Sequence, residues 1–125
     1  MTHRTTIVAA MTALLPLMAA AHTTLMQSIP ANGSVVKMAP AQLVLRFSEA
    51  AALTKLTIQK TGDKEAQTLG PLSRTAAEHF LIAAPKLGPG SYVVRYRALS
   101  DDGHVASGTL TFTVSANAAA PKPKP

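Results

Sequence analysis

The chain contains the alternating stretch Gln42-Leu43-Val44-Leu45-Arg46-Phe47-Ser48. Successive side chains of a β-strand point to opposite faces, so Leu43, Leu45 and Phe47 share one face of this stretch while Gln42, Val44, Arg46 and Ser48 share the other. An apolar face opposite a more polar one is typical of a strand that covers a core on one side only. The stretch is therefore predicted to be a half-buried strand.

Similar short segments occupy the rest of the chain beyond residue 21. Strands are predicted over residues 23–29, 35–38, 53–60, 66–69, 79–84, 92–97 and 109–115, with turn residues between them at intervals of about ten residues. No helical periodicity is present beyond residue 21. This pattern predicts an all-β sandwich of about seven strands.

The segment before the strand at 92–97 indicates which kind of sandwich this is. It reads Leu87-Gly88-Pro89-Gly90-Ser91-Tyr92, in which glycine and proline form a corner directly before a tyrosine. It resembles the tyrosine corner of immunoglobulin-like Greek-key sandwiches, where a tyrosine hydroxyl bonds to nearby backbone. Tyr92 is the candidate for that role.

Residues 1–21 have the features of a secretory signal peptide. Arg4 is followed by an uncharged apolar run over residues 7–20, and Ala19-Ala20-Ala21 matches a small-residue cleavage site. An uncleaved membrane anchor is the alternative, but the run is shorter than the span of about 20 residues that a bilayer needs. Cleavage after Ala21 and export to the periplasm are predicted, with no membrane insertion of the mature chain.

The mature chain is expected to be one domain with a short tail. Residues 22–115 have the length of an ordinary domain. Residues 116–125 consist almost entirely of Ala, Pro and Lys, which cannot bury enough apolar surface to become ordered. A flexible tail is predicted there, and the domain is expected to be a monomer.

The composition excludes some kinds of site. The chain has no cysteine, so a soft-metal site must use histidine, carboxylate or methionine. The formal net charge is +6, but the basic residues are scattered singly along the sequence, which disfavours nucleic acid as a partner. A solvated basic surface is the simpler interpretation.

Three residues could form a copper site. Cleavage after Ala21 would give His22 a free α-amino group, so this residue would offer the amine and its ring Nδ1 to one metal ion. Asp102 and His104 are two positions apart and would project to the same side of an extended backbone, with Gly103 permitting close approach. Together they supply three nitrogens and one oxygen, a set that suits tetragonal Cu(II). Alone, an Asp-x-His segment is more often a hydrogen-bonded turn.

The arrangement resembles the CopC family of periplasmic copper-binding proteins. The shared features are a mature chain that begins with histidine, the segment from His22 to Pro30, the Leu45-Arg46-Phe47-Ser48-Glu49 stretch, and the Asp102-Gly103-His104 motif before a strand containing Gly108. The resemblance implies an immunoglobulin-like sandwich that binds Cu(II) through His22, Asp102 and His104. It also implies that Glu49 lies near the site as a weak ligand or a partner of the ligands; a surface carboxylate is the alternative.

The methionines depart from the pattern of family members that bind Cu(I) through a methionine-rich loop. Only Met26 and Met38 follow the predicted cleavage site, and core or edge-strand packing is the expected role of both. His79 is expected to be a polar residue at a strand end, and His3 is removed with the signal.

The sequence therefore predicts a carrier or buffer of Cu(II) in copper homeostasis and resistance, with a membrane copper transporter as a candidate donor or acceptor. No serine, histidine and carboxylate set is apparent, so an enzyme is not expected. Two alternatives stay open. One is an oxidative copper enzyme resembling lytic polysaccharide monooxygenases, although the chain has only five aromatic residues; the other is a metal-free interaction module.

Overall fold

The computed structural model describes residues 23–117 of the chain. The predicted signal peptide, His22 and residues 118–125 lie outside the described residues. The described part forms seven strands and no helix: β1 (Leu25–Ile29), β2 (Ser34–Val36), β3 (Gln42–Lys60), β4 (Gln67–Thr68), β5 (Ala77–Ala83), β6 (Gly90–Ser100) and β7 (Val105–Val114). The all-β sandwich of about seven strands is confirmed.

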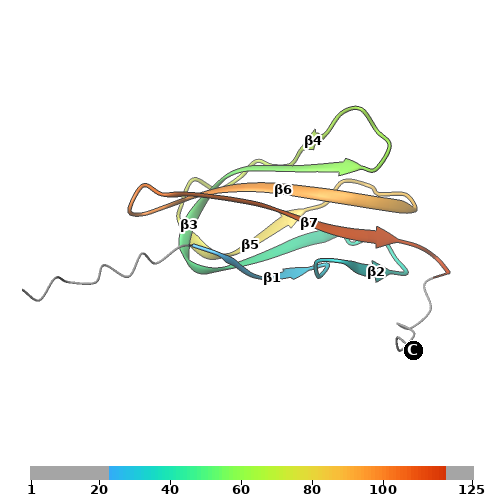
Figure 1. Ribbon diagram of the computed structural model, residues 1–125, viewed down its shortest axis with the longest axis horizontal. Coiled ribbons are helices and arrows are strands. Elements are labelled where there is room, and N and C mark those ends of the chain that lie inside the picture. Colours follow the sequence, from blue (N-terminus) through green and yellow to red (C-terminus); the bar gives the residue numbers. More distant parts are fainter. Residues whose placement is uncertain (1–22, 118–125) are drawn as a thin grey trace, which may run out of the picture.

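Strand β3 belongs to both layers of the sandwich. Its first part pairs antiparallel with β1 and β5, and its second part pairs antiparallel with β6 and β4. Figure 1 shows β3 curving around one end of the molecule from the lower layer to the upper one. The strand therefore connects the two layers without a loop.

This continuity corrects the sequence-based prediction of two separate strands over residues 42–48 and 53–60. The intervening Glu49-Ala50-Ala51-Ala52 has no glycine or proline to end the strand. The chain bends instead at irregularities in pairing, which lie between Arg46 and Ala51 opposite β5 and between Leu53 and Lys55 opposite β6. Such bulges let a strand change direction while the ladder continues.

Strands β6 and β7 form a long hairpin, and the turn that joins them contains Asp102 and His104. Ten residue pairs join them, from Gly90 opposite Val114 to Leu99 opposite Val105. Strand β2 pairs in parallel with the last residues of β7, from Phe112 to Val114. Along the first half of β7 an opening therefore remains between β7 and β1.

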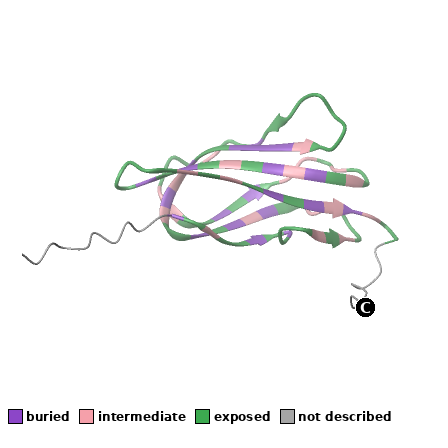
Figure 2. Ribbon diagram, in the orientation of Figure 1, coloured by how far each residue is buried: buried purple, intermediate pink, exposed green. Residues whose placement is uncertain are grey.

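The core follows the alternation of the strands. Leu43, Leu45 and Phe47 are each 1% exposed, as the alternation of apolar and polar residues over 42–48 predicts. Figure 2 shows buried and exposed residues alternating along β3, β6 and β7. Burying each large apolar side chain contributes about 1.5–3 kcal/mol. Because the chain has no cysteine, this packing and the backbone ladders hold the sandwich together.

Tyr92 confirms the predicted tyrosine corner. Its hydroxyl donates a hydrogen bond of 2.6 Å to the carbonyl oxygen of Gly88, four residues upstream. Its ring is buried and stacks on Phe112 with a centroid distance of 5.5 Å. The bond fixes the loop before β6, while the ring joins β6 to β7.

Neither methionine is buried in the core; Met26 lies on the edge strand β1, one of the two expected positions, whereas Met38 does not lie on a strand. Met26 is 63% exposed and Met38 is 81% exposed. Met26 is the extra residue at a pairing irregularity of the edge strand β1, between Leu25 and Gln27. Met38 lies in the loop after β2. An edge bulge and a loop turn both side chains toward solvent.

Within residues 23–117, no helix has the length and apolar character needed to cross a bilayer.

Candidate metal centre

The candidate ligands Asp102 and His104 lie on the turn between β6 and β7. The Gly103 N–H donates to the Ser100 carbonyl at 3.0 Å, and the Ser100 N–H donates to the His104 carbonyl at 2.9 Å. Gly103 has φ +84°, a left-handed conformation that glycine adopts without the steric penalty of a side chain. This is a three-residue hairpin loop with glycine at its left-handed position. The turn residues Asp101, Asp102 and Gly103 favour it.

The turn places the two candidate ligands in contact. His104 Nδ1 lies 3.1 Å from Asp102 Oδ2, and the side chains of His104 and Asp102 are 68% and 54% exposed. Within the described part of the chain, Nε2 of His104 has no hydrogen-bond partner. This exposed pair therefore leaves one imidazole nitrogen without a hydrogen-bond partner in that part of the chain.

The reason for this proximity differs from the predicted one. The spacing in the sequence predicts an extended backbone that directs both side chains to the same side, with Gly103 permitting close approach. A turn brings them together instead, and a Cβ at Gly103 would meet nothing within 4 Å. Gly103 is therefore needed for its backbone conformation rather than for space.

Ser100 holds Asp102 in place, a role that sequence reasoning missed. Its hydroxyl donates a short hydrogen bond to Asp102 Oδ1 and also lies 3.0 Å from the His104 carbonyl oxygen. The His104 backbone N–H donates to Asp102 Oδ1 at 3.2 Å. The bonds from Ser100 and then from the His104 backbone lower the pKa of Asp102, because they favour its charged form. A serine two residues before an aspartate in a hairpin turn was the available signal.

The start of the described chain lies beside this turn. Thr23, Ser100 and His104 line one hollow of about 480 Å³. The backbone next to Thr23 is fixed, because the Thr24 N–H donates to Ser48 Oγ at 2.9 Å and the Ser48 N–H donates to the Thr24 carbonyl at 2.8 Å. The hydroxyl of Thr23 is buried and has no hydrogen-bond partner among the described residues.

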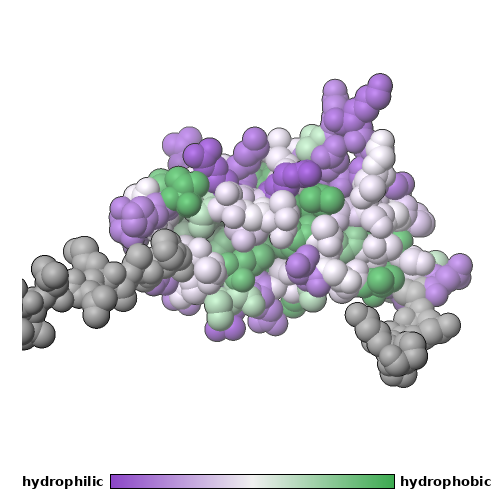
Figure 3. Space-filling model, in the orientation of Figure 1, coloured by the Kyte–Doolittle hydropathy of each residue, from purple (hydrophilic) through white to green (hydrophobic). Residues whose placement is uncertain are grey.

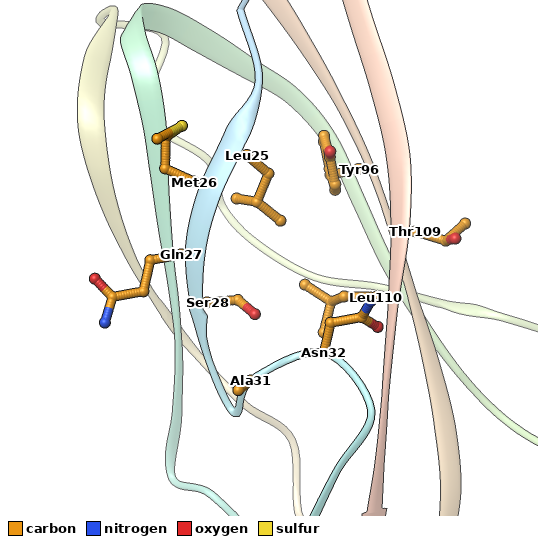
Figure 4. Close-up of a pocket in the computed structure, with 9 residues that line it drawn as sticks. All are labelled: Leu25, Met26, Gln27, Ser28, Ala31, Asn32, Tyr96, Thr109 and Leu110. Carbon is orange, nitrogen blue, oxygen red and sulfur yellow. The ribbon is translucent and has the colours of Figure 1, made fainter.

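The hollow continues along the opening between β1 and β7. A second hollow shares Leu25 and Tyr96 with the first and extends to Asn32. Figure 4 shows Leu25 and Ser28 of β1 pointing toward Leu110 of β7, whereas Met26 and Gln27 point away. The turn therefore lies at one end of a groove between the two strands.

Glu49 and His79 are not brought into contact with the pair. Glu49 is exposed on the bend of β3, two residues before Ala51, which pairs with Ser100. Its side chain makes no hydrogen bond or ion pair within residues 23–117, so its predicted role near the site stays a prediction. His79 of β5 is exposed and lies opposite Arg46 of β3.

The described residues alone do not complete a metal site. Among residues 23–117, no group of three or more histidine, aspartate, glutamate or cysteine side chains could hold a metal ion. Asp102 and His104 supply two candidate ligands, and His22 would have to supply the others. The fold and this turn define a β-sandwich protein with candidate metal ligands at one end.

Comparison with known proteins identifies the family. The family model of the CopC domain matches residues 25–115. Copper resistance protein C of Pseudomonas syringae pv. tomato is 34% identical over 111 residues, covering 78% of this chain and 83% of that protein. Protein YobA of Escherichia coli K12 is 33% identical over 99 residues, covering 75% and 79%. The chain belongs to the CopC family.

Solved structures agree with this assignment. The crystal structure of CopC from Methylosinus trichosporium OB3b has a TM-score of 0.62 and 30% identity, covering 75% of this chain and 94% of that one. PcoC, a methionine-rich copper resistance protein from Escherichia coli, has a TM-score of 0.56 and 32% identity, covering 76% and 100%. The family is one of copper resistance proteins rather than enzymes, in agreement with the sequence-based expectation.

Proposed function

We propose that this chain is a periplasmic protein that binds one Cu(II) ion and carries or buffers it in copper homeostasis and resistance. His22 would provide its α-amino group and ring nitrogen, and the turn between β6 and β7 would provide His104 and Asp102. The observation that carries the proposal is the hollow lined by both Thr23 and His104. Thr23 is the covalent neighbour of His22, so residues distant in sequence meet at one end of the sandwich.

The contacts of the turn suggest how the ligands divide their roles. Asp102 Oδ2 accepts from the Nδ1 side of His104, which leaves Nε2 as the nitrogen available to copper. A carboxylate behind a metal-binding histidine orients its ring and increases its basicity. Direct coordination by Asp102 requires this carboxylate to turn away from Nδ1, while Ser100 can still hold Oδ1.

The preference for Cu(II) follows from the donors. Amine, imidazole and carboxylate groups suit Cu(II), whereas Cu(I) prefers thioether and thiolate ligands. Met26 and Met38 lie on a strand bulge and in a loop, respectively, and neither lines the hollow at His104. The protein is proposed to act as a monomer that receives or delivers copper, with a membrane copper transporter as the candidate partner.

The test is a Cu(II) titration of the chain that begins at His22, followed by electron paramagnetic resonance. We expect one Cu(II) ion per chain and a tetragonal spectrum with nitrogen couplings. His104→Ala should weaken binding by more than tenfold and remove nitrogen coupling, since it deletes a ligand. His79→Ala is the matched control, because His79 is an exposed histidine outside the hollow. Equal binding by wild type and His104→Ala would refute the site.

A further inference from the structure

The folded chain gathers basic residues that are separate in the sequence. Lys55 of β3 lies directly opposite Arg97 of β6, and Thr57 lies opposite Arg95. Residues two apart on a strand share a face, so Lys55, Arg95 and Arg97 form one group on the outer side of the β3–β6 ladder. All three are exposed. We call this group the cationic face.

The strands around the cationic face carry no negative charge. The second part of β3 from Ala51 to Lys60, all of β6 and all of β7 contain no aspartate or glutamate. None of the three cations makes an ion pair within the described part of the chain. Arg95 instead donates to the Gln59 side-chain oxygen at 3.1 Å. Because like charges directly opposite each other destabilise a ladder, the arrangement of Lys55 and Arg97 disfavours the free fold.

Two hollows flank the cationic face, and Lys55 and Arg97 line both. One hollow, of about 430 Å³, is completed by Thr54, Leu99 and Val105. The other, of about 290 Å³, includes Thr57, Ala66 and Arg95. Figure 3 shows hydrophilic side chains gathered along the upper edge of the molecule, where Figure 1 places β3, β4 and β6.

The first hollow also has an apolar wall. Leu99 and Val105 are 40% and 51% exposed and pair with each other across β6 and β7. They are the last residue pair before the turn that carries Asp102 and His104. The cationic face, an exposed apolar pair and the candidate metal centre therefore follow one another along the same hairpin.

We propose that the cationic face is a docking surface for an acidic segment of a partner protein. Neighbouring strands are about 4.8 Å apart and same-face residues about 7 Å apart, so the three cations match two or three carboxylates on one segment. Arginine binds carboxylates with paired hydrogen bonds, which adds geometric specificity. An apolar side chain of the same segment would fit against Leu99 and Val105. The group is too small to match the broad negative field of a lipid surface or a nucleic acid duplex.

The location of the cationic face also matters for copper exchange. A partner held on the cationic face would lie beside the turn at Asp102 and His104, in a position to exchange copper with it. This consequence rests on the proposed function. The docking itself does not, so its test is carried out without metal.

The experiment measures binding of a labelled ten-residue peptide of alternating glutamate and leucine by fluorescence anisotropy. The variant Lys55→Gln/Arg95→Gln/Arg97→Gln removes the cationic face. The control variant Lys37→Gln/Lys64→Gln/Lys86→Gln removes the same charge from exposed positions elsewhere. We expect affinity to fall about tenfold or more in the first variant and to change little in the control, with binding that weakens as salt increases.

Equal losses in the two variants would overturn the proposal, because net charge alone would then explain binding. It would also be overturned if wild type bound the glutamine–leucine version of the peptide equally well. Vesicles with 30% phosphatidylserine and a 12-base-pair DNA duplex are tested in parallel. Tighter binding of either one than of the acidic peptide would reject the protein partner.

Discussion

At the level of single residues, the candidate site depends on the different surroundings of the two ring nitrogens of His104. Nδ1 faces Asp102 at 3.1 Å, whereas Nε2 has no hydrogen-bond partner among residues 23–117. Asp102 is in turn held by Ser100 and by the His104 backbone N–H. An exposed histidine on a free hairpin tip would sample several rotamers. Here its orientation is restricted by a carboxylate that is itself fixed.

Ser100→Ala should raise the pKa of Asp102 toward its ordinary value, because it removes the largest cause of the lowered pKa. A carboxyl whose pKa is lowered by folding stabilises the protein above its unfolded pKa of about 3.9. That contribution is lost as the pH falls through the lower, folded pKa. The variant should therefore lose part of this acid-dependent stability. Carboxyl-carbon NMR titration measures the pKa directly, with Ser91→Ala as the control; an unchanged pKa would contradict the role of Ser100.

Adding a methionine before His22 should weaken Cu(II) binding by more than the 10- to 100-fold effect of changes around metal ligands. The addition converts the free amine into an amide but leaves the imidazole in place. Because the amine and both imidazoles must lose protons to bind, affinity should also fall as the pH decreases. Competition titrations on the two forms provide the measurement. Equal affinity would show that the amine is not a ligand.

At the scale of elements, β6 and β7 depend on a close fit between a tyrosine and a glycine. A Cβ at Gly108 would overlap the Tyr96 hydroxyl and lie 2.7 Å from its Cζ. The Tyr96 ring also packs edge-on against Phe47, with a centroid distance of 5.5 Å. Gly108 therefore makes room for a side chain that joins the hairpin to β3 and lines the hollow at His104.

Gly108→Ala should destabilise the fold by about 1–3 kcal/mol, the typical effect of overpacking. Chemical denaturation measures the change, and Ser107→Ala, at an exposed neighbouring position, is the control. Adding Tyr96→Leu to Gly108→Ala should recover part of the loss, because the overlapping atoms are then absent. A neutral Gly108→Ala would mean that the Tyr96 ring moves aside freely.

Much of this architecture could be predicted from local pattern. Alternation identified the buried Leu43, Leu45 and Phe47, and a glycine-proline corner identified Tyr92. Features that depend on pairing between distant segments could not be predicted. Alternation alone does not reveal that β3 continues through a bend, and single basic residues do not reveal that Lys55 faces Arg97. For the site, the sequence indicated Asp102 and His104 but not the backbone conformation that joins them.

At the scale of the whole molecule, the sandwich is complete before the predicted tail. The Ser115 N–H donates the last backbone hydrogen bond to β2, at 2.9 Å from the carbonyl oxygen of Val36. Val114 is the last buried apolar residue of the described chain. Ending the chain after Ala116 should therefore leave the melting temperature and copper stoichiometry nearly unchanged.

Calorimetry and a Cu(II) titration of the shortened chain test this expectation. A chain that ends at Leu110 is the control, since it lacks the buried Phe112 and Val114 and should not fold. A large decrease in melting temperature on ending at Ala116 would show that the tail contributes to the fold.

The direction of the first and last strands determines how the molecule would respond to mechanical force. The described chain leaves the sandwich at opposite ends, so tension applied to its two termini would pull β1 and β7 along their own axes (Figure 1). Hydrogen bonds loaded in this shearing direction share the force and must break together rather than one at a time. β1 has four paired residues on β3, whereas β7 has ten on β6. Under tension β1 should slide first, which would separate Thr23 from His104 while the rest of the sandwich is still folded.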